Sequence, residues 1–147
     1  MEYKYYGADL SGIYAKNDDY PGINTVQDLY DAMSEIWCEY SCAPRYRKEW
    51  SKENMTLGQC SITSFLVQDI FGGGVYGVPR EEGVFHCFNI VDGKVFDITS
   101  EQYGDEVLTY NTDYEQSREE HFANQEKYER YRYLCDKLHE YCERAKR

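Results

Sequence analysis

The clearest hydrophobic pattern in the chain predicts a helix over residues 26–40. Apolar side chains recur there at three- and four-residue intervals, which places them on one helical face. This face comprises Val26, Leu29, Tyr30, Met33, Ile36 and Trp37. Asn24 or Thr25 is a suitable N-cap, because either side chain can accept a hydrogen bond from the first turn. Residues 1–24 carry only short strand-like patterns interrupted by glycines, so we expect an N-terminal arm there.

A second apolar pattern predicts a helix within residues 57–71. Its apolar positions follow helical spacing at Ile62, Phe65, Leu66 and Ile70. Gly58 and Gln59 form the predicted entry, and Cys60 falls in the first turn. Three consecutive glycines at 72–74 end the helix. A glycine run can also suggest a phosphate-binding loop, but the strand before it and the helix after it that such a loop requires are missing.

A two-residue turn signal at residues 92–93 predicts a β-hairpin. Residues 84–91 form its first strand and residues 94–98 its return strand. The turn length sets the register, in which His86 and Asp97 become diagonal neighbours on one face, with their Cα atoms about 7 Å apart. A shift of one residue would separate these two side chains, because neighbouring residues of a strand point to opposite faces.

Residues 114–146 are predicted to form one long, charged helix capped by Asp113. Its apolar stripe is narrow, so the helix either lies along the body of the domain or pairs with another chain. The stripe comprises Phe122, Tyr128, Tyr131, Leu134, Leu138 and Tyr141.

Together these patterns predict an α+β fold. A length of 147 residues favours a single domain. The helix that begins at Cys60 is expected to pack on a small antiparallel sheet built around the hairpin. We divide the domain into an N-terminal arm (1–24), a core (25–112) and a long C-terminal helix (113–147).

The charge of the chain excludes several kinds of partner. Lys and Arg number 16 and Asp and Glu number 27, which gives a formal net charge of −11. This balance argues against nucleic acid and anionic membrane surfaces, because both attract basic proteins. No apolar run reaches about 18 residues and no signal-peptide core occurs, so we expect neither a membrane span nor a signal peptide. Six cysteines without an export signal indicate reduced thiols and a cytoplasmic location.

Residues 41–56 interleave basic and aromatic side chains. The basic residues are Arg45, Arg47, Lys48 and Lys52, and the aromatic residues are Tyr46 and Trp50. This mixture is typical of a surface that binds phosphate or nucleic acid. On so acidic a chain, we favour a solvated loop that is anchored by its two aromatic residues.

Cys60, His86 and Asp97 have the residue types and the chain order of a nucleophile, a general base and an orienting acid. The positive end of the helix dipole stabilises a thiolate in the first turn, which lowers the pKa of the thiol. A neighbouring imidazole lowers it further, and a carboxylate behind the imidazole sets its tautomer. The backbone N–H of Cys60 and the side chain of Gln59 are candidate donors to an oxyanion. This arrangement predicts attack on an amide or ester carbonyl, and it implies no metal and no other cofactor.

Other functions remain open on the same residues. Acyl transfer to an amine, as in transglutaminase-like enzymes, uses the same three side chains and differs only in the acceptor. A non-catalytic interpretation keeps Cys60 buried and makes the protein a scaffold that binds a protein partner. Self-association through the C-terminal helix is a further expectation. Thiol reactivity separates these interpretations, because a catalytic thiol is partly exposed and has a low pKa.

Cys135, His139 and Cys142 fall on one face of the predicted C-terminal helix and invite a zinc interpretation. Structural zinc sites favour tighter spacings, so we expect these side chains to serve packing instead. His121 lies in a charged stretch and is expected to be solvated. Cys87 lies on the strand face opposite the predicted histidine base and is expected to belong to the core.

Two blocks of sequence resemble the signature of the YunG-like family of small bacterial proteins. The first block carries Gly-Gln-Cys at 58–60, Val-Gln-Asp at 67–69 and Phe-Gly-Gly at 71–73. The second block lies within residues 86–103 and contains the Asp-Gly-Lys sequence of the hairpin turn. The resemblance covers about residues 26–103.

Proteins of this kind resemble compact papain-like and NlpC/P60-like cysteine hydrolases. The resemblance implies a papain-like core, in which a helix that carries the cysteine packs on an antiparallel sheet that carries the histidine. It implies Cys60 as the nucleophile, His86 as the base and Asp97 as the orienting residue. The substrate it implies is an unidentified peptide, amide or ester. The 41–56 loop looks individual to this chain, and the 114–146 helix lies outside the resemblance.

Overall fold

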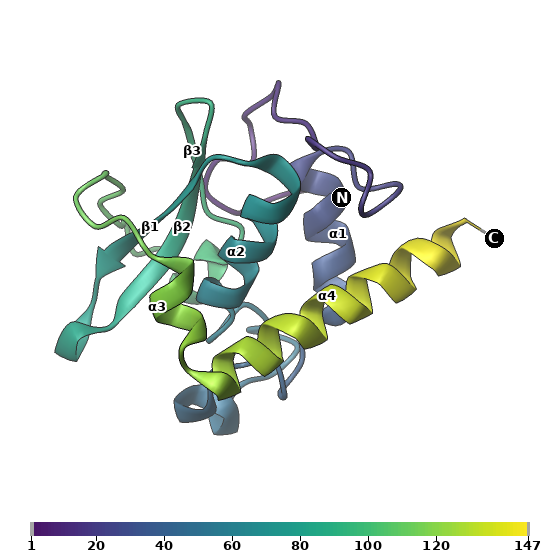
Figure 1. Cartoon of the computed structure of the whole chain (residues 1–147). Helices are drawn as coiled ribbons and strands as arrows, with labels where there is room; N and C mark the ends of the chain where they lie inside the picture. The colour runs from purple at the N-terminus through teal and green to yellow at the C-terminus, as the bar shows by residue number, and fades with distance from the viewer. Residues whose placement is uncertain (1, 147) are drawn as a thin grey trace.

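The computed structural model describes residues 2–146, apart from the side chain of Glu82. Along the chain its elements are α1 (Val26–Ile36), η1 (Pro44–Glu49), α2 (Cys60–Phe71), β1 (Gly74–Pro79), η2 (Glu81–Gly83), β2 (Phe85–Val91), β3 (Lys94–Phe96), η3 (Ser100–Tyr103), α3 (Arg118–Phe122) and α4 (Gln125–Ala145). Within the described residues the strands form one antiparallel sheet in the order β1-β2-β3. Figure 1 shows α2 between this sheet and α1, with α4 passing across both helices. The predicted α+β fold is confirmed.

Helix α1 begins where the capping signal places it. The Thr25 hydroxyl accepts a hydrogen bond from the backbone N–H of Asp28, whose carboxylate accepts one from the N–H of Thr25. Every residue of the predicted apolar face is buried. The helix ends at Ile36 instead of continuing to residue 40, because the backbone of Trp37 turns to an extended conformation with ψ at 133°.

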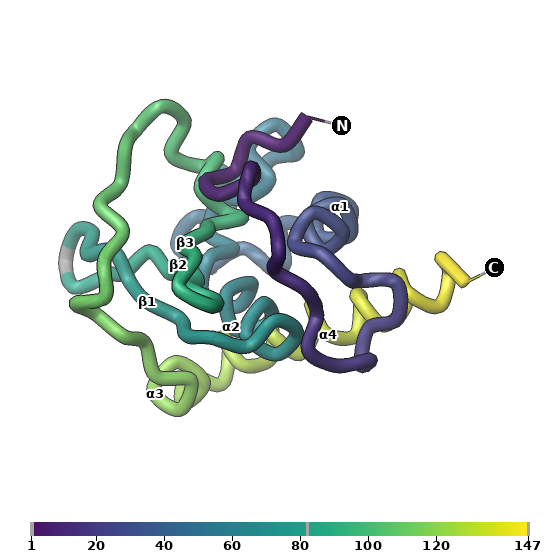
Figure 2. The backbone as a smooth tube through the Cα atoms, turned by 90° about the horizontal axis from the view of Figure 1, so that it is seen from above, coloured from purple at the N-terminus to yellow at the C-terminus, as the bar shows by residue number. Residues whose placement is uncertain are grey.

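Helix α2 forms the centre of the core, and its observed start and end agree with the prediction. Gly72 ends it with φ at 80°, a left-handed conformation that glycine adopts without strain. Figure 2 shows α2 between strand β2 and helix α4, and it packs against both. Because two neighbours cover it, its buried residues occupy much of its circumference. They are Ile62, Thr63, Ser64, Phe65, Leu66, Val67, Ile70 and Phe71.

The predicted hairpin is present in the predicted register. Val91 pairs with Lys94, and both turn residues, Asp92 and Gly93, have positive φ angles of 52° and 77°. Two positive φ angles are what a tight hairpin turn of this twist requires. The return strand ends early, at Phe96, because the next residue pairs with the N-terminal arm instead.

Strand β1 is absent from the sequence-based prediction. It contains two glycines and a terminal proline, which weaken a strand pattern, yet it pairs along nearly the whole of β2. Gly73, just before it, has φ at 72°, and a Cβ atom there would lie 2.2 Å from the carbonyl oxygen of Ile90. Only glycine therefore lets the chain pass this close to β2 as it leaves α2.

The prediction of one long helix over residues 114–146 is wrong, because α3 and α4 are separate helices. Asn124 divides them, since its side chain accepts a hydrogen bond from the N–H of Lys127 and starts α4 anew. The predicted cap at Asp113 is also wrong, because Ser117 caps α3.

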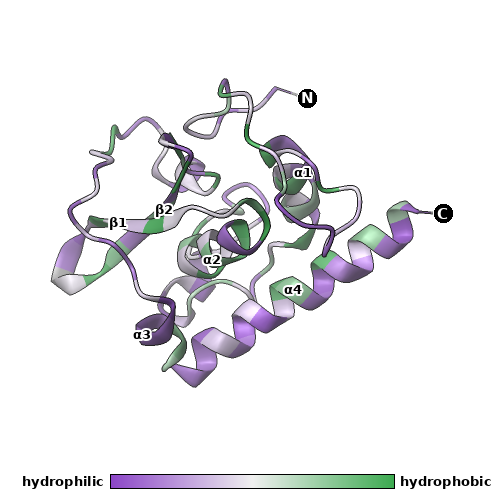
Figure 3. Cartoon of the chain, turned by 45° about the horizontal axis from the view of Figure 1, so that its top comes forward, coloured by the Kyte–Doolittle hydropathy of each residue, from purple (hydrophilic) through white to green (hydrophobic). Residues whose placement is uncertain are grey.

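Helix α4 lies across α1 and α2 and buries one face against the core. This face comprises Arg130, Tyr131, Leu134, Cys135, Leu138 and Cys142. Figure 3 shows hydrophobic and hydrophilic residues alternating along the helix, as expected when only one side is covered. Of the two predicted placements, the helix takes the one along the body of the domain. In the part of the chain that the structure describes, no helix is both long and apolar enough to cross a membrane.

The N-terminal arm packs against this core. Tyr5, Ile13 and Tyr20 are buried in it. The arm forms backbone bridges where Tyr6 pairs with Asp97 and where Tyr14 pairs with Thr25. The arm therefore closes over the end of β3, where it pairs with Asp97.

Candidate active site

His86 and Asp97 form a buried pair at the base of the hairpin. His86 Nε2 lies 2.6 Å from Asp97 Oδ2, and the two side chains are 0% and 1% exposed. The hairpin register predicts this proximity, and the structure confirms it. A carboxylate bonded to one ring nitrogen orients the imidazole and leaves the other nitrogen for chemistry.

Further donors hold the Asp97 carboxylate in place. The backbone N–H and the hydroxyl of Thr99 both donate to Oδ1 at 3.2 Å. The Tyr110 hydroxyl donates to Oδ2 at 2.8 Å. Tyr110 lies in the irregular segment after the hairpin, where no sequence pattern indicates a role. Each carboxylate oxygen is thus bonded, which compensates for the burial of its charge.

The second ring nitrogen of His86 is left for the nucleophile. Nδ1 is buried and has no hydrogen-bond partner among the described residues. The ring of Tyr103 meets the imidazole edge to face, with ring centroids 4.8 Å apart. Cys60 lies close enough to His86 for each residue to shift the pKa of the other. The structure therefore brings the three predicted catalytic residues together.

Charge within the site favours a thiolate. Hydrogen bonding by the Cys87 thiol is the largest cause that holds the pKa of Cys60 well below its ordinary value; His86 adds to it, and burial opposes both. The pKa of Cys87 is raised in turn, so this thiol keeps its proton and donates. For His86, burial lowers the pKa, but Asp97 and then Cys60 outweigh it and raise the pKa to about 10. Both shifts favour a Cys60 thiolate beside a protonated His86.

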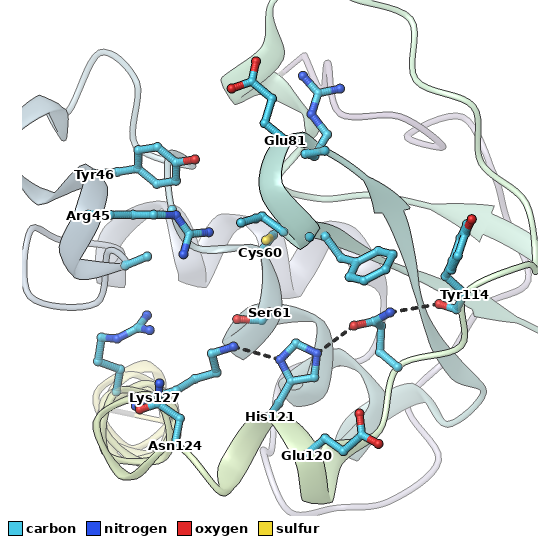
Figure 4. A pocket seen from close by; sticks show the side chains of 18 of the residues that line it. Arg45, Tyr46, Cys60, Ser61, Glu81, Tyr114, Glu120, His121, Asn124 and Lys127 are labelled. Atoms are coloured by element: carbon cyan, nitrogen blue, oxygen red, sulfur yellow. Dashed lines mark hydrogen bonds between the residues drawn. The ribbon is translucent and has the colours of Figure 1, made fainter.

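Cys60 opens into a pocket of about 1200 Å³. Figure 4 shows this residue at the wall of the pocket, where Arg45 and Tyr46 of η1 approach it from one side. Cys60 is partly exposed, whereas His86 and Asp97 are buried. A molecule in the pocket therefore meets the sulfur atom first and the imidazole behind it.

Gln59 is placed differently from the other predicted site residues. Its side chain is buried, its Nε2 donates to the carbonyl oxygen of Cys38 at 3.1 Å, and its Oε1 has no hydrogen-bond partner among the described residues. Its role as an oxyanion donor stays a prediction. The backbone N–H of Cys60 is the better placed candidate, since an N–H at the start of a helix has no acceptor within that helix.

Several contacts outside the predicted triad hold the site together. The indole of Trp37 donates to the Thr63 hydroxyl at 3.0 Å, which ties the end of α1 to α2. Asn89 donates to the carbonyl oxygen of Ser64 at 2.9 Å, which ties β2 to α2. Gly58 has φ at 71°, and a Cβ there would lie 2.6 Å from Cys42 Sγ. These contacts fix the start of α2, and with it Cys60, relative to the strand that carries the histidine.

The 41–56 loop has a more specific place than a solvated loop. It folds in part into η1, and its residues Arg45 and Tyr46 are exposed but line the pocket. The Trp50 indole donates to the carbonyl oxygen of Met55 at 2.9 Å, so this aromatic residue anchors the loop as predicted.

His121 is not the solvated side chain that the sequence suggests. It is partly buried in the pocket wall, where its Nε2 lies 2.8 Å from Gln116 Oε1 and its Nδ1 lies 2.9 Å from Lys127 Nζ. The prediction is wrong because the break at Asn124 folds α3 back over α2. No local sequence signal indicates this arrangement.

The residues of the zinc interpretation serve packing. Cys135 and Cys142 are buried in the core, and His139 stacks on Tyr20 with ring centroids 4.4 Å apart. Within residues 2–146, no group of three or more His, Cys, Asp or Glu side chains is arranged to hold a metal ion. Cys87 is buried in the core, as predicted.

Comparison with known proteins identifies the family. The sequence profile described as "YunG protein" matches residues 25–143, a range that includes α3 and most of α4. A curated relative, "Uncharacterized protein YunG" of Bacillus subtilis (strain 168), is 31% identical over 102 residues, which are 68% of this chain and 82% of the relative. No solved structure matches, so these comparisons lend the papain-like likeness no support. The profile match over most of the chain, together with this relative, shows that the chain belongs to the YunG family.

Proposed function

We propose that this protein is a thiol-dependent hydrolase or acyltransferase that acts on an amide or ester bond. The observation that carries the proposal is the alignment of a buried Asp97–His86 pair behind Cys60, which faces a pocket. A thiolate stabilised by its surroundings, next to an oriented imidazole, has the parts that covalent acyl transfer requires.

In the first step the Cys60 thiolate attacks the carbonyl carbon of the substrate and forms a C–S bond. The negative charge moves to the carbonyl oxygen, which the Cys60 N–H and the Gln59 side chain stabilise in this proposal. Protonated His86 then gives its proton to the leaving amine or alcohol as the C–N or C–O bond breaks. A thioester on Cys60 is the product of this step.

In the second step His86 takes a proton from water or from an amine, which attacks the thioester carbon. The C–S bond breaks, the acid or the new amide leaves, and the thiolate re-forms. Asp97 keeps the imidazole oriented in both steps. Water as the acceptor makes the protein a hydrolase, and an amine makes it an acyltransferase.

The papain-like likeness belongs to this proposal. It is supported by the cysteine at the start of a helix that packs on an antiparallel sheet carrying the histidine. We place the reaction in the cytoplasm, because six unpaired cysteines suit a reducing compartment.

The test is site-resolved alkylation by iodoacetamide between pH 5 and pH 9, read by mass spectrometry. A depressed pKa keeps Cys60 ionised at a lower pH than an ordinary thiol, so its alkylation should persist toward pH 5–6, where that of the other cysteines falls off. An ordinary thiol slows by about tenfold per pH unit below its pKa. His86→Ala should raise the pKa of Cys60 and slow its alkylation at pH 6 by about tenfold or more.

His139→Ala is the matched control, because this exposed histidine of α4 stacks on Tyr20 far from the catalytic cysteine in sequence and fold. Formation of a Cys60 thioester with an activated ester should also be lost in His86→Ala and retained in the control. A Cys60 that alkylates no faster than the other thiols would overturn the proposal. A scaffold that binds a protein partner would then be the better interpretation.

A further inference from the structure

The cationic side chains that line the pocket in front of Cys60 differ in whether a carboxylate is paired with them. Arg45, Arg80, Lys127 and Arg130 all line it. Arg80 and Arg130 are each paired with a glutamate at 2.7 Å. Among the side chains that the structure describes, no carboxylate forms an ion pair with Arg45 or Lys127. Two positive charges at this site are therefore left for a ligand.

A chain of hydrogen bonds holds the Lys127 ammonium group in place. Its Nζ donates to His121 Nδ1 at 2.9 Å, and His121 Nε2 donates to Gln116 Oε1 at 2.8 Å. Gln116 Nε2 in turn donates to the carbonyl oxygen of Tyr114 at 3.0 Å. Burial, then the charge of Lys127, lowers the pKa of His121 to about 4, so the ring is neutral and can accept this bond at neutral pH. Figure 4 shows the chain along the pocket wall.

This ammonium group lies next to the nucleophile. Figure 4 shows Lys127 pointing toward Ser61, the neighbour of Cys60, while Arg45 enters the same space from the opposite side. Burial lowers the pKa of Lys127, and the nearby Cys60 thiolate acts against this. A partly buried cation without a carboxylate is costly to keep, and an anionic ligand would remove that cost.

We propose that Lys127, together with Arg45, binds a carboxylate of the substrate, so that the pocket selects amides or esters that carry a carboxylate close to the scissile carbonyl. The inference rests on the proposed function, because it assigns a substrate class to the same site. An ammonium and a guanidinium group both form short, charge-assisted hydrogen bonds with a carboxylate.

The acidic side chains of the pocket determine on which side a substrate carboxylate can bind. Asp113, Glu115 and the Arg130-paired Glu126 line the pocket as well. Glu81 and Glu120 also line it, and both are exposed. In Figure 4 they lie at the margins, away from the space between Arg45 and Lys127. A substrate carboxylate is repelled from their side and attracted to the lysine. On a chain with a net charge of −11, and in a pocket that carboxylates also line, two cations that no described carboxylate pairs with can discriminate among ligands.

The test compares two alkylating agents of nearly the same shape, anionic iodoacetate and neutral iodoacetamide, on the full chain at pH 7. The measured quantity is the ratio of their rates at Cys60. Lys127→Met should lower this ratio by about threefold to tenfold, because a nearby charge is lost in a partly screened site. Any change in the pKa of Cys60 affects both reagents equally and cancels in the ratio. Lys127→Arg should keep the ratio near that of the wild type.

Lys137→Met is the matched control, because it removes the same charge from the same helix at an exposed position outside the pocket. In the wild type, 1 M salt should also lower the ratio, which tests the proposal without any variant. If Cys60 alkylates readily with iodoacetamide but the ratio is unchanged in Lys127→Met and in high salt, the carboxylate inference fails and the proposed function stands. If Cys60 reacts with neither reagent faster than other thiols do, both fail.

Discussion

At the scale of single residues, the ionisation of Cys60 depends on a neighbour that is not part of the predicted triad. Cys87 follows the histidine on β2 and is completely buried. Hydrogen bonding by its thiol lowers the pKa of Cys60, to which His86 adds, and its own pKa is raised. In the proposed reaction this leaves the histidine to carry protons, because it does not have to create the thiolate alone.

We expect Cys87→Ala to raise the pKa of Cys60, since the substitution removes this donor. Alkylation of Cys60 by iodoacetamide at pH 6 should slow by about threefold to tenfold, while the rate at pH 9 changes little. Cys142→Ala, which removes a buried thiol from α4, is the control. A profile for Cys87→Ala that coincides with the wild type would show that the second thiol has no part in the ionisation.

At the scale of elements, the ends of helices and strands prepare the site. In the hairpin register, a longer β3 would offer the backbone N–H of Cys87 a partner at Ile98. The strand ends at Phe96, and this N–H instead helps to lower the pKa of Cys60. The break between α3 and α4 also shapes the site, because the Asn124 cap begins α4 at the turn that carries Lys127.

Asn124→Ala should destabilise the protein by about 1 kcal/mol, the usual effect of losing an N-cap acceptor. Asn124→Asp should recover most of this loss, because aspartate is an equally good cap. Urea unfolding followed by circular dichroism measures both. Equal stability of the alanine and aspartate variants would mean that the cap does not set this boundary.

At the scale of the whole molecule, α4 belongs to the fold. It lies across α1 and α2 with a buried face, and the family match reaches residue 143 near its end. Self-association through this helix remains an expectation, and it would have to use the outer, polar face. The proposed substrate pocket takes Lys127 from α4 and Cys60 from α2, so it also requires the two helices to stay packed.

Leu138→Ala should lower the free energy of unfolding by about 2–5 kcal/mol, because the Leu138 side chain is completely buried on the face of α4 that packs against the core. Asp136→Ala, on the exposed side of the same helix, should change it by less than about 0.5 kcal/mol. Urea unfolding at two protein concentrations separates the alternatives. If the loss in Leu138→Ala disappeared on dilution, Leu138 would stabilise an assembly instead of the single chain.

Local rules were enough to predict the His86–Asp97 pair and the helix that carries Cys60. A two-residue turn with positive φ at both positions sets a hairpin register, and that register brings His86 to Asp97 across only 11 residues of chain. Helical spacing and glycine punctuation likewise locate α2 and its cysteine. These features depend on short-range backbone geometry, which neighbouring residues specify.

The rest of the site was decided only by the tertiary structure. Tyr110, His121 and Lys127 reach the site from segments whose sequence carries no sign of it. The sequence does not predict strand β1, because its glycines weaken the strand pattern and only pairing with β2 makes it a strand. The sequence predicts one long helix instead of two, because Asn124 looks like any other polar residue within a charged stretch. The packing that brings these segments to the site, such as that of His121 on Phe65, joins residues far apart in the chain. Their pairing depends on how packed surfaces fit together, and no periodicity along the sequence records that fit.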